Sequence, residues 1–229
     1  MQTTEISARV LDERAFIGRV YWWMAVALCL TAVVALWTAS TPALQQVILG
    51  NQIVFYGLII GELGLVFYLS ARIAKMSVQA ASVAFVVYSL LNGLTLSIVF
   101  LAFTSASLAS TFFVTAGTFG FMSAYGYFTK TDLTRIGNIC FMALIGLILA
   151  TLVNMFWQNS MLYWITTYAG VLIFVGLTAY DTQKIKRIGQ TVDETSDEGK
   201  KAAVMGALAL YLDFINLFLM MLRIFGQRR

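Results

Sequence analysis

Four ionisable residues lie within or at the edge of long apolar stretches: Glu62, Arg72, Asp181 and Asp213. A charged side chain at the centre of a bilayer costs roughly 2.5–3.5 kcal/mol on insertion scales, so such residues face protein or water and mark functional sites by default. Asp213 stands near the middle of one apolar run, and Asp181 stands at the end of the run before it. The chemistry to consider first is therefore that of two carboxyl groups held inside a membrane.

Two carboxyl groups in contact at low dielectric cannot both ionise cheaply, so they titrate as a coupled pair and can hold a proton near neutral pH. Loss of that proton would create an anionic site that suits a hard cation such as Ca²⁺. A nearby arginine, Arg72, would compete for the same charge. The pair would then have two states, one bridged by a proton and one bound to a cation or to arginine. The plainer alternative is a buried polar network that only fixes helix register.

Seven apolar runs position these residues, and each is close to the about 20 residues that a helix needs to cross a bilayer. The runs cover residues 20–39, 52–71, 78–103, 109–128, 137–157, 161–181 and 202–222. In the last run, Gly206, Ala209, Asn216 and Met220 share the face of Asp213, because three- and four-residue steps return to one side of a helix. Small and polar residues let neighbouring helices approach closely. We therefore expect this helix to pack among the others.

The composition indicates one membrane domain spanning residues 1–229. Hydrophobic residues make up 60% of the chain and charged residues only 11%, against about 25% charged residues in soluble domains. The chain has no histidine, which removes histidine-based catalysis and the usual physiological pH switch. Cys29 and Cys140 both lie in apolar runs, which predicts buried thiols rather than a redox motif. We expect no enzymatic activity, no cofactor and no nucleic-acid partner.

The basic residues predict the orientation in the membrane. Of the 15 lysines and arginines, 12 fall in the N-terminal stretch or in the connections after the second, fourth and sixth runs. The positive-inside rule makes that side cytoplasmic, together with the N-terminal segment 1–19. Seven crossings would place Arg223, Arg228 and Arg229 on the outside. A last run that entered and returned would place all 15 basic residues inside, but we predict seven full crossings, because residues 202–222 are long enough to span the bilayer.

This orientation brings the candidate residues together. Arg72 and Asp181 fall at the cytoplasmic ends of their helices, and Asp213 lies 11 residues into the last run, or about 16 Å at 1.5 Å per residue. The helix that holds Asp181 could continue through Gln183 to Arg187, which would place Asp181 deeper, so that Asp181 and Asp213 can meet in the cytoplasmic half with Arg72 within reach. Glu62 lies farther from that side.

Other polar residues and glycines within the runs have more than one interpretation. Tyr88, Asn92 and Thr95 form a stripe on the third helix, which either lines a pore or makes hydrogen bonds between helices. Gly57 and Gly61 form a GxxxG pattern that Gly64 extends, and this pattern predicts close helix packing. The candidate pore-lining residues are Glu62, Asn92 and Asn216.

Two segments, residues 179–186 (AYDTQKIK) and 209–218 (ALYLDFINLF), resemble the transmembrane Bax-inhibitor-motif family, and the layout of the runs matches as well. The resemblance implies seven transmembrane helices with the C-terminal helix in the centre, wrapped by the other six. It implies a pH-sensitive calcium leak, with Asp181 and Asp213 as the sensor and calcium ligands, and Arg72 as the gating partner. Some family members are instead described as binding partners that restrain membrane proteases or cell-death proteins. The short termini suggest a bacterial inner membrane.

An intramembrane aspartyl protease is the rival enzyme, because it also needs two membrane aspartates, one of them preceded by tyrosine as Asp181 is by Tyr180. Its second aspartate would resemble Gly-x-Gly-Asp, whereas Asp213 follows Leu210-Tyr211-Leu212, and the chain has no proline except Pro42. We therefore predict a pH-gated cation leak that prefers calcium. A proton-coupled transporter, and a regulator that binds other membrane proteins without transport, are the alternatives.

Overall fold

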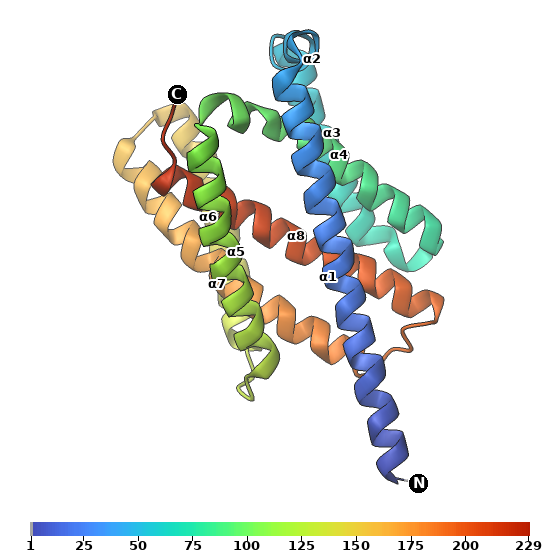
Figure 1. The fold of residues 1–229 in the computed structure, drawn as a ribbon. Helices are drawn as coiled ribbons and strands as arrows, with labels where there is room; N and C mark the ends of the chain where they lie inside the picture. Colours follow the sequence, from blue (N-terminus) through green and yellow to red (C-terminus); the bar gives the residue numbers. More distant parts are fainter. Residues whose placement is uncertain (1) are drawn as a thin grey trace. The chain divides into compact units, whose positions relative to one another are not determined.

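A computed structural model describes the backbone of residues 2–229 and the side chains from residue 13 onward. These residues form eight α-helices and one 3₁₀ helix (Figure 1), and none of them forms a β-strand, so the all-helical class is confirmed. The elements are α1 (Gln2–Ser40), α2 (Pro42–Ile48), α3 (Gln52–Arg72), η1 (Ile73–Lys75), α4 (Val78–Ala102), α5 (Ser105–Phe128), α6 (Thr134–Trp157), α7 (Ser160–Gly189) and α8 (Asp197–Phe225).

Six of the helices in the described part of the chain are long and apolar enough to cross a membrane: α1, α3, α4, α6, α7 and α8. The predicted fourth run corresponds to α5, which has the same 24-residue length as α6 but carries seven serines and threonines. These hydroxyl groups lower its mean hydropathy, so seven crossings are not confirmed. Of the six candidate spans, α8 has the largest buried share of its apolar window, which agrees with a helix packed among others.

Several helix ends differ from the predicted runs. Helix α1 begins at Gln2, so the segment predicted as a polar N-terminal stretch is helical, although its side chains 1–12 lie outside the described residues. Helix α7 continues to Gly189, and α8 begins five residues before the predicted run. A helix can begin in polar sequence when a side chain caps its first turn. The Ser196 hydroxyl caps α8 in this way, because it accepts a hydrogen bond from the Gly199 amide at 3.0 Å.

The prediction of close packing at the GxxxG pattern was wrong. A Cβ atom at Gly57, Gly61 or Gly64 would meet nothing within 4 Å, so this face of α3 is open among the described residues. Close approach occurs on α4 instead, where a Cβ at Gly93 would lie 2.7 Å from Cβ of Val34 on α1. The glycine spacing alone therefore did not identify the helix face that packs.

The helices divide into two compact units. The first unit contains residues 1–104, 187–211 and 229, and the second contains residues 105–186 and 212–228. Two helices contribute to both units, because α7 enters the first unit at Arg187 and α8 enters the second at Leu212. Each unit is described below by itself.

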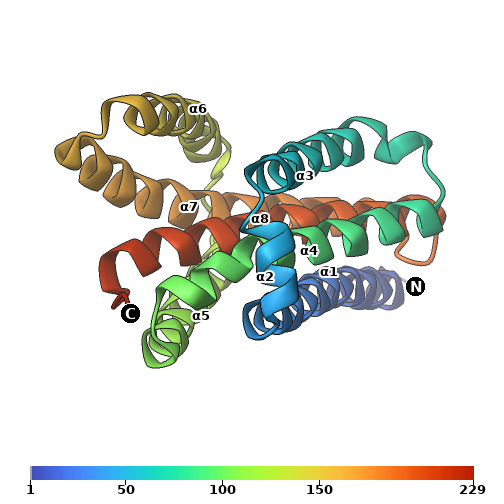
Figure 2. The same ribbon diagram turned by 90° about the horizontal axis from the view of Figure 1, so that it is seen from above.

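The first unit is built on the packing of α1 against α4 (Figure 2). Tyr211 of α8 is fully buried there, and its hydroxyl lies 2.7 Å from Oγ1 of Thr31 on α1. Thr31 in turn donates to the carbonyl of Ser89 on α4 at 2.8 Å. The Tyr211 ring also makes edge contacts with Phe85 and Tyr88. One tyrosine therefore joins three helices through both hydrogen bonds and aromatic packing.

Replacing this tyrosine, Tyr211→Phe, is expected to lower the free energy of unfolding by about 0.5–1.5 kcal/mol, because it removes one buried hydrogen bond and keeps the ring. Unfolding of the purified protein in mixed detergent micelles measures the change. The control is Tyr56→Phe, since Tyr56 is 56% exposed on α3. Equal stability of the two variants would show that the Tyr211 hydroxyl contributes nothing.

The connection between α7 and α8 is held against α1 within the first unit. Arg19 contacts the Glu194 carboxylate at 3.3 Å and donates to the Glu194 carbonyl at 2.6 Å. Gln190 donates to the Glu13 carboxylate at 3.0 Å. Hydrogen bonds from the Thr195 side chain and backbone hold the pKa of Asp193 below its usual range. The mixed acidic stretch is therefore an ordered connection, and Asp193 keeps its charge at neutral pH.

Candidate functional site

The two predicted sensor aspartates meet in the second unit. Asp181 lies near the end of α7, and Asp213 lies in the middle of α8. A hydrogen bond joins their side chains. Asp213 is only 4% exposed, whereas Asp181 is half-buried. A hydrogen bond between two carboxyl groups forms only when one of them holds a proton.

The surroundings of the pair supply little compensation for a second negative charge. Oδ2 of Asp213 is buried and has no hydrogen-bond partner among the described residues. The basic side chain that acts on Asp181 is Lys184, three residues later on α7. Cys140 of α6 lies within electrostatic range of Asp213. A fully ionised pair therefore needs a further positive charge close to Asp213.

The donor set determines what that charge can be. The described residues contain no group of three or more histidine, cysteine, aspartate or glutamate side chains that could hold a metal ion. Two carboxyl groups with water and carbonyl oxygens suit a weakly held hard cation of the Ca²⁺ class, because calcium accepts oxygen ligands in flexible geometry.

Two glycines let neighbouring helices pack against α7 at this level. A Cβ at Gly126 of α5 would collide with the carbonyl of Ala179, two residues before Asp181. A Cβ at Gly137 of α6 would collide with the ring of Tyr180. The α7 backbone beside Asp181 is therefore positioned by contacts that only glycine permits, and neither glycine was singled out from the sequence.

Two residues after Asp181 fasten α7 to the last turn of α5 and to the loop between α5 and α6. Gln183 accepts a hydrogen bond from the Leu133 amide at 2.9 Å and donates to the Thr131 carbonyl at 2.8 Å. Lys186 donates to the backbone carbonyl of Tyr127 at 2.9 Å, and its ammonium nitrogen lies 4.7 Å from the centre of the Tyr127 ring. Both residues belong to the AYDTQKIK segment, so the motif holds structural residues as well as a candidate sensor.

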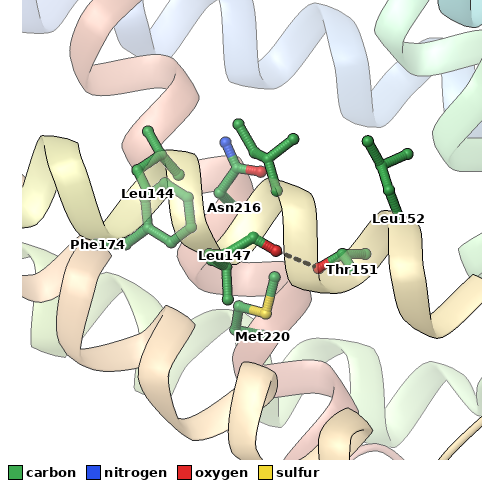
Figure 3. Close-up of a pocket in the computed structure, with 8 residues that line it drawn as sticks. Leu144, Leu147, Thr151, Leu152, Phe174, Asn216 and Met220 are labelled. Carbon is green, nitrogen blue, oxygen red and sulfur yellow. Dashed lines mark hydrogen bonds between the residues drawn. The ribbon is translucent and has the colours of Figure 1, made fainter.

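Asn216, a predicted pore-lining residue, lies one turn after Asp213 and faces an apolar groove of about 190 Å³ in the second unit. Figure 3 shows Asn216 and Met220 of α8 beside Leu147 and Thr151 of α6. The Asn216 amide nitrogen donates to the Leu212 carbonyl at 2.8 Å. The groove lining is otherwise almost entirely apolar, so a pore at Asn216 stays a prediction.

Two predicted residues, Glu62 and Asn92, lie together in the first unit. Thr95 Oγ1 of α4 donates to Oε1 of Glu62 on α3 at 2.9 Å, and Asn92 Nδ2 donates to the Tyr88 hydroxyl at 3.2 Å. The predicted polar stripe on the third run therefore makes hydrogen bonds both within α4 and to α3. Its possible role in lining a pore stays a prediction.

Arg72 is the last residue of α3 and is exposed. It belongs to the first unit, whereas the aspartate pair belongs to the second. The charge found to act on Asp181 is that of Lys184. The role of Arg72 as the gating partner stays a prediction.

Comparisons with known proteins agree over nearly the whole chain. The sequence profile of a family described as inhibitor of apoptosis-promoting Bax1 (Bax1-I) matches residues 13–229. The inner membrane protein YbhL of Escherichia coli strain K12 is 52% identical over 217 residues, which cover 94% of this chain and 93% of that protein. A protein of Borreliella burgdorferi is 41% identical over 99% of this chain, and one of Rickettsia prowazekii is also 41% identical over 99%. These relatives match the chain along their length, so the likeness is not confined to one motif.

Proposed function

Starting from the fact that this chain belongs to the Bax1-I family of integral, multi-pass membrane proteins, we propose that it is a pH-sensitive cation leak that prefers calcium. The observation that carries the proposal is the hydrogen bond between the half-buried carboxyl group of Asp181 and the buried carboxyl group of Asp213. Among the residues whose side chains are described, Lys184 is the basic residue that acts on Asp181, and the ion pair found joins Arg19 to Glu194 instead. Intramembrane carboxyl groups of this kind mark ion and proton pathways in membrane proteins.

The proposed mechanism is a switch between two states of the pair. With one proton bound, the hydrogen bond holds α7 against α8 and no dianionic site exists. When that proton leaves, the two carboxylates repel each other at low dielectric, and the repulsion is relieved by a cation or by a basic side chain such as Arg72. Calcium is favoured because its charge offsets both carboxylates and its ligands are oxygen atoms. Protons and cations thus compete for the same pair.

The arrangement in the membrane is part of the proposal. Helix α5 serves as the seventh crossing, because it has the length and its hydroxyl groups can bond to its own backbone, as Thr115 does to the Thr111 carbonyl at 2.8 Å. Helix α8, the most buried of the six apolar spans, serves as the centre wrapped by the others. The basic connections place the N-terminus in the cytoplasm, and the E. coli relative's name supports the inner membrane.

The connection between α7 and α8 is a poor alternative sensor. Hydrogen bonds lower the pKa of Asp193, so this group stays ionised over the range in which the pair is proposed to titrate. Glu194 is held by Arg19. A response near neutral pH is therefore assigned to the pair, not to the acidic stretch outside the membrane.

The test is calcium entry into liposomes that contain the purified full-length protein, compared at about pH 6 and about pH 8. We expect flux above that of empty liposomes, with different rates at the two pH values. Because the liposomes contain no other protein, flux above that of empty liposomes would show that the protein is itself the leak. Absence of flux at both pH values would contradict the proposal and favour a regulator that binds other membrane proteins without transport.

A further inference from the structure

A second intramembrane carboxyl group lies apart from the aspartate pair, in the first unit. Glu62 stands at the middle of α3, ten residues from either end, which is about 15 Å along the helix axis. Its side chain is buried, with a relative exposure of 9%. No lysine or arginine among the described residues forms an ion pair with it, and the charged pair found elsewhere in the first unit joins Arg19 to Glu194.

The environment of Glu62 supplies oxygen atoms. Helix α4 carries Tyr88, Asn92 and Thr95 at four- and three-residue steps, so their side chains share one face, and Thr95 of this face contacts α3. Thr95 Oγ1 contacts Oε1 of Glu62 at 2.9 Å. Asn92 uses its amide nitrogen toward the Tyr88 hydroxyl at 3.2 Å, which leaves its amide oxygen as an acceptor. The cluster therefore combines carboxylate, hydroxyl, amide and phenol oxygens, with no sulfur or imidazole.

We propose that Glu62, Thr95, Asn92 and Tyr88 form a second binding site for a hard cation of the Ca²⁺ class. The role of this site as a second station of the leak rests on the proposed function, whereas its capacity to bind a cation does not. A buried carboxylate at mid-helix without a basic partner is costly. A buried carboxyl group is neutralised either by a proton or by a cation, and the Thr95 hydroxyl that donates to Glu62 stabilises the ionised form that a cation would bind.

A site with one carboxylate and neutral oxygens binds hard cations in preference to transition metals, because carboxylate, carbonyl and hydroxyl oxygens are hard ligands. Affinity is expected to be modest, since calcium affinity in proteins rises with the number of charged ligands. A modest affinity is what a conduction pathway needs, because an ion must leave a site as well as enter it. The chemistry therefore fits a transit site better than a permanent one.

Protons compete with the cation at this site. The titratable groups beside Glu62 are Tyr88 on α4 and Tyr211 on α8, which stack edge-on with ring centres 5.9 Å apart. The chain contains no histidine, and neither tyrosine carries a positive charge. Cation binding at Glu62 is therefore expected to weaken as pH falls, because only the ionised carboxylate is a strong ligand.

The test measures binding of radiolabelled calcium to the full-length protein in lipid nanodiscs. The double variant Asp181→Asn with Asp213→Asn removes the carboxylates of the pair and is expected to retain calcium binding. Adding Glu62→Gln to that background is expected to lower the remaining affinity at least about tenfold. Glutamine keeps the size of the side chain and an acceptor for Thr95, so the helix contact is preserved.

Thr95→Val provides a second variant that leaves the carboxylate in place, and it is expected to weaken binding several-fold. Its matched control is Thr118→Val on α5, because the Thr118 hydroxyl bonds only to the Val114 carbonyl, at 2.9 Å. Calcium binding that disappears in the double aspartate variant, or that is unchanged by Glu62→Gln, would overturn the inference. A protein that binds calcium through Glu62 but passes none into liposomes would instead contradict only the proposed function.

Discussion

Asp213→Asn is expected to abolish the pH dependence of calcium flux. Asparagine can donate a hydrogen bond to Asp181, as a protonated aspartate does, but it cannot ionise. The pair then never becomes a dianion, and the variant is fixed in the equivalent of the protonated state. We expect its flux at about pH 8 to match the flux of the native protein at about pH 6, so that the ratio of the two rates approaches one.

The burial of Asp213 makes this the largest functional effect expected of a single change at the pair. The side chain is 4% exposed and one of its oxygens is buried without a partner, so its ionisation must be compensated locally. Calcium affinity of the pair is expected to fall about tenfold or more, since one of its two charged ligands is lost. Asp181→Asn is expected to act in the same way, because both changes prevent the dianion.

The matched control is Asp193→Asn, which makes the same chemical change in the connection outside the candidate spans. Asp193 is ionised at neutral pH, so its replacement is expected to leave the pH response of the flux intact. The measurement is calcium entry at both pH values into liposomes that contain equal amounts of each protein. Thermal unfolding in detergent checks that each variant is folded. A pH response that persists in Asp213→Asn would remove the pair from the role of sensor.

The meeting of Asp181 and Asp213 was predictable from the sequence for simple reasons. Run lengths near that of a membrane-spanning helix, together with alternating basic connections, placed both carboxyl groups in the cytoplasmic half of consecutive helices. The structure joins them by a hydrogen bond. The helix limits of α3 and α4 also fall within one residue of the predicted runs, because their ends coincide with the change from apolar to polar residues.

The features that sequence reasoning missed depend on tertiary contacts or on helix capping. The starts of α1 and α8 lie in polar sequence, where hydropathy carries no signal, and a side-chain cap marks the start of α8. The GxxxG pattern of α3 faces no close neighbour, whereas Gly93, Gly126 and Gly137 stand alone in the sequence and make the close contacts. A glycine becomes a packing residue only through the atoms opposite it, which one sequence does not identify.

The buried polar residues show the same limit. Tyr88, Asn92 and Thr95 were recognisable as a stripe on one helix, but their partner Glu62 lies 33 residues before Thr95 and on another helix. Gln183 and Lys186 belong to a motif that the sequence identifies. Their hydrogen bonds, to Thr131 in the loop after α5 and to Tyr127 at the end of α5, could be identified only from the folded structure. The sequence therefore indicates which polar groups need partners, and the packing decides which partners they find.

Gly126→Ala is expected to give the largest loss of stability among the glycine changes on α5. The added Cβ would collide with the carbonyl of Ala179 on α7, a backbone atom that cannot rotate away. Overpacking of this kind typically costs about 1–3 kcal/mol, and the better helix propensity of alanine recovers only up to about 1 kcal/mol. We therefore expect a net decrease in the free energy of unfolding, measured in mixed detergent micelles.

The control is Gly120→Ala on the same helix, because a Cβ there would meet nothing within 4 Å. This variant is expected to be as stable as the native protein or slightly more stable, since alanine favours the helix. The two variants share one chemical change and one helix, so their difference isolates the contact with Ala179. That contact lies two residues before Asp181, and moving α7 there changes the distance between the two carboxyl groups. We expect Gly126→Ala, unlike Gly120→Ala, to shift the pH response of calcium flux as well. Equal stability and equal pH response of the two variants would show that the contact between Gly126 and Ala179 neither stabilises the fold nor positions the aspartate pair.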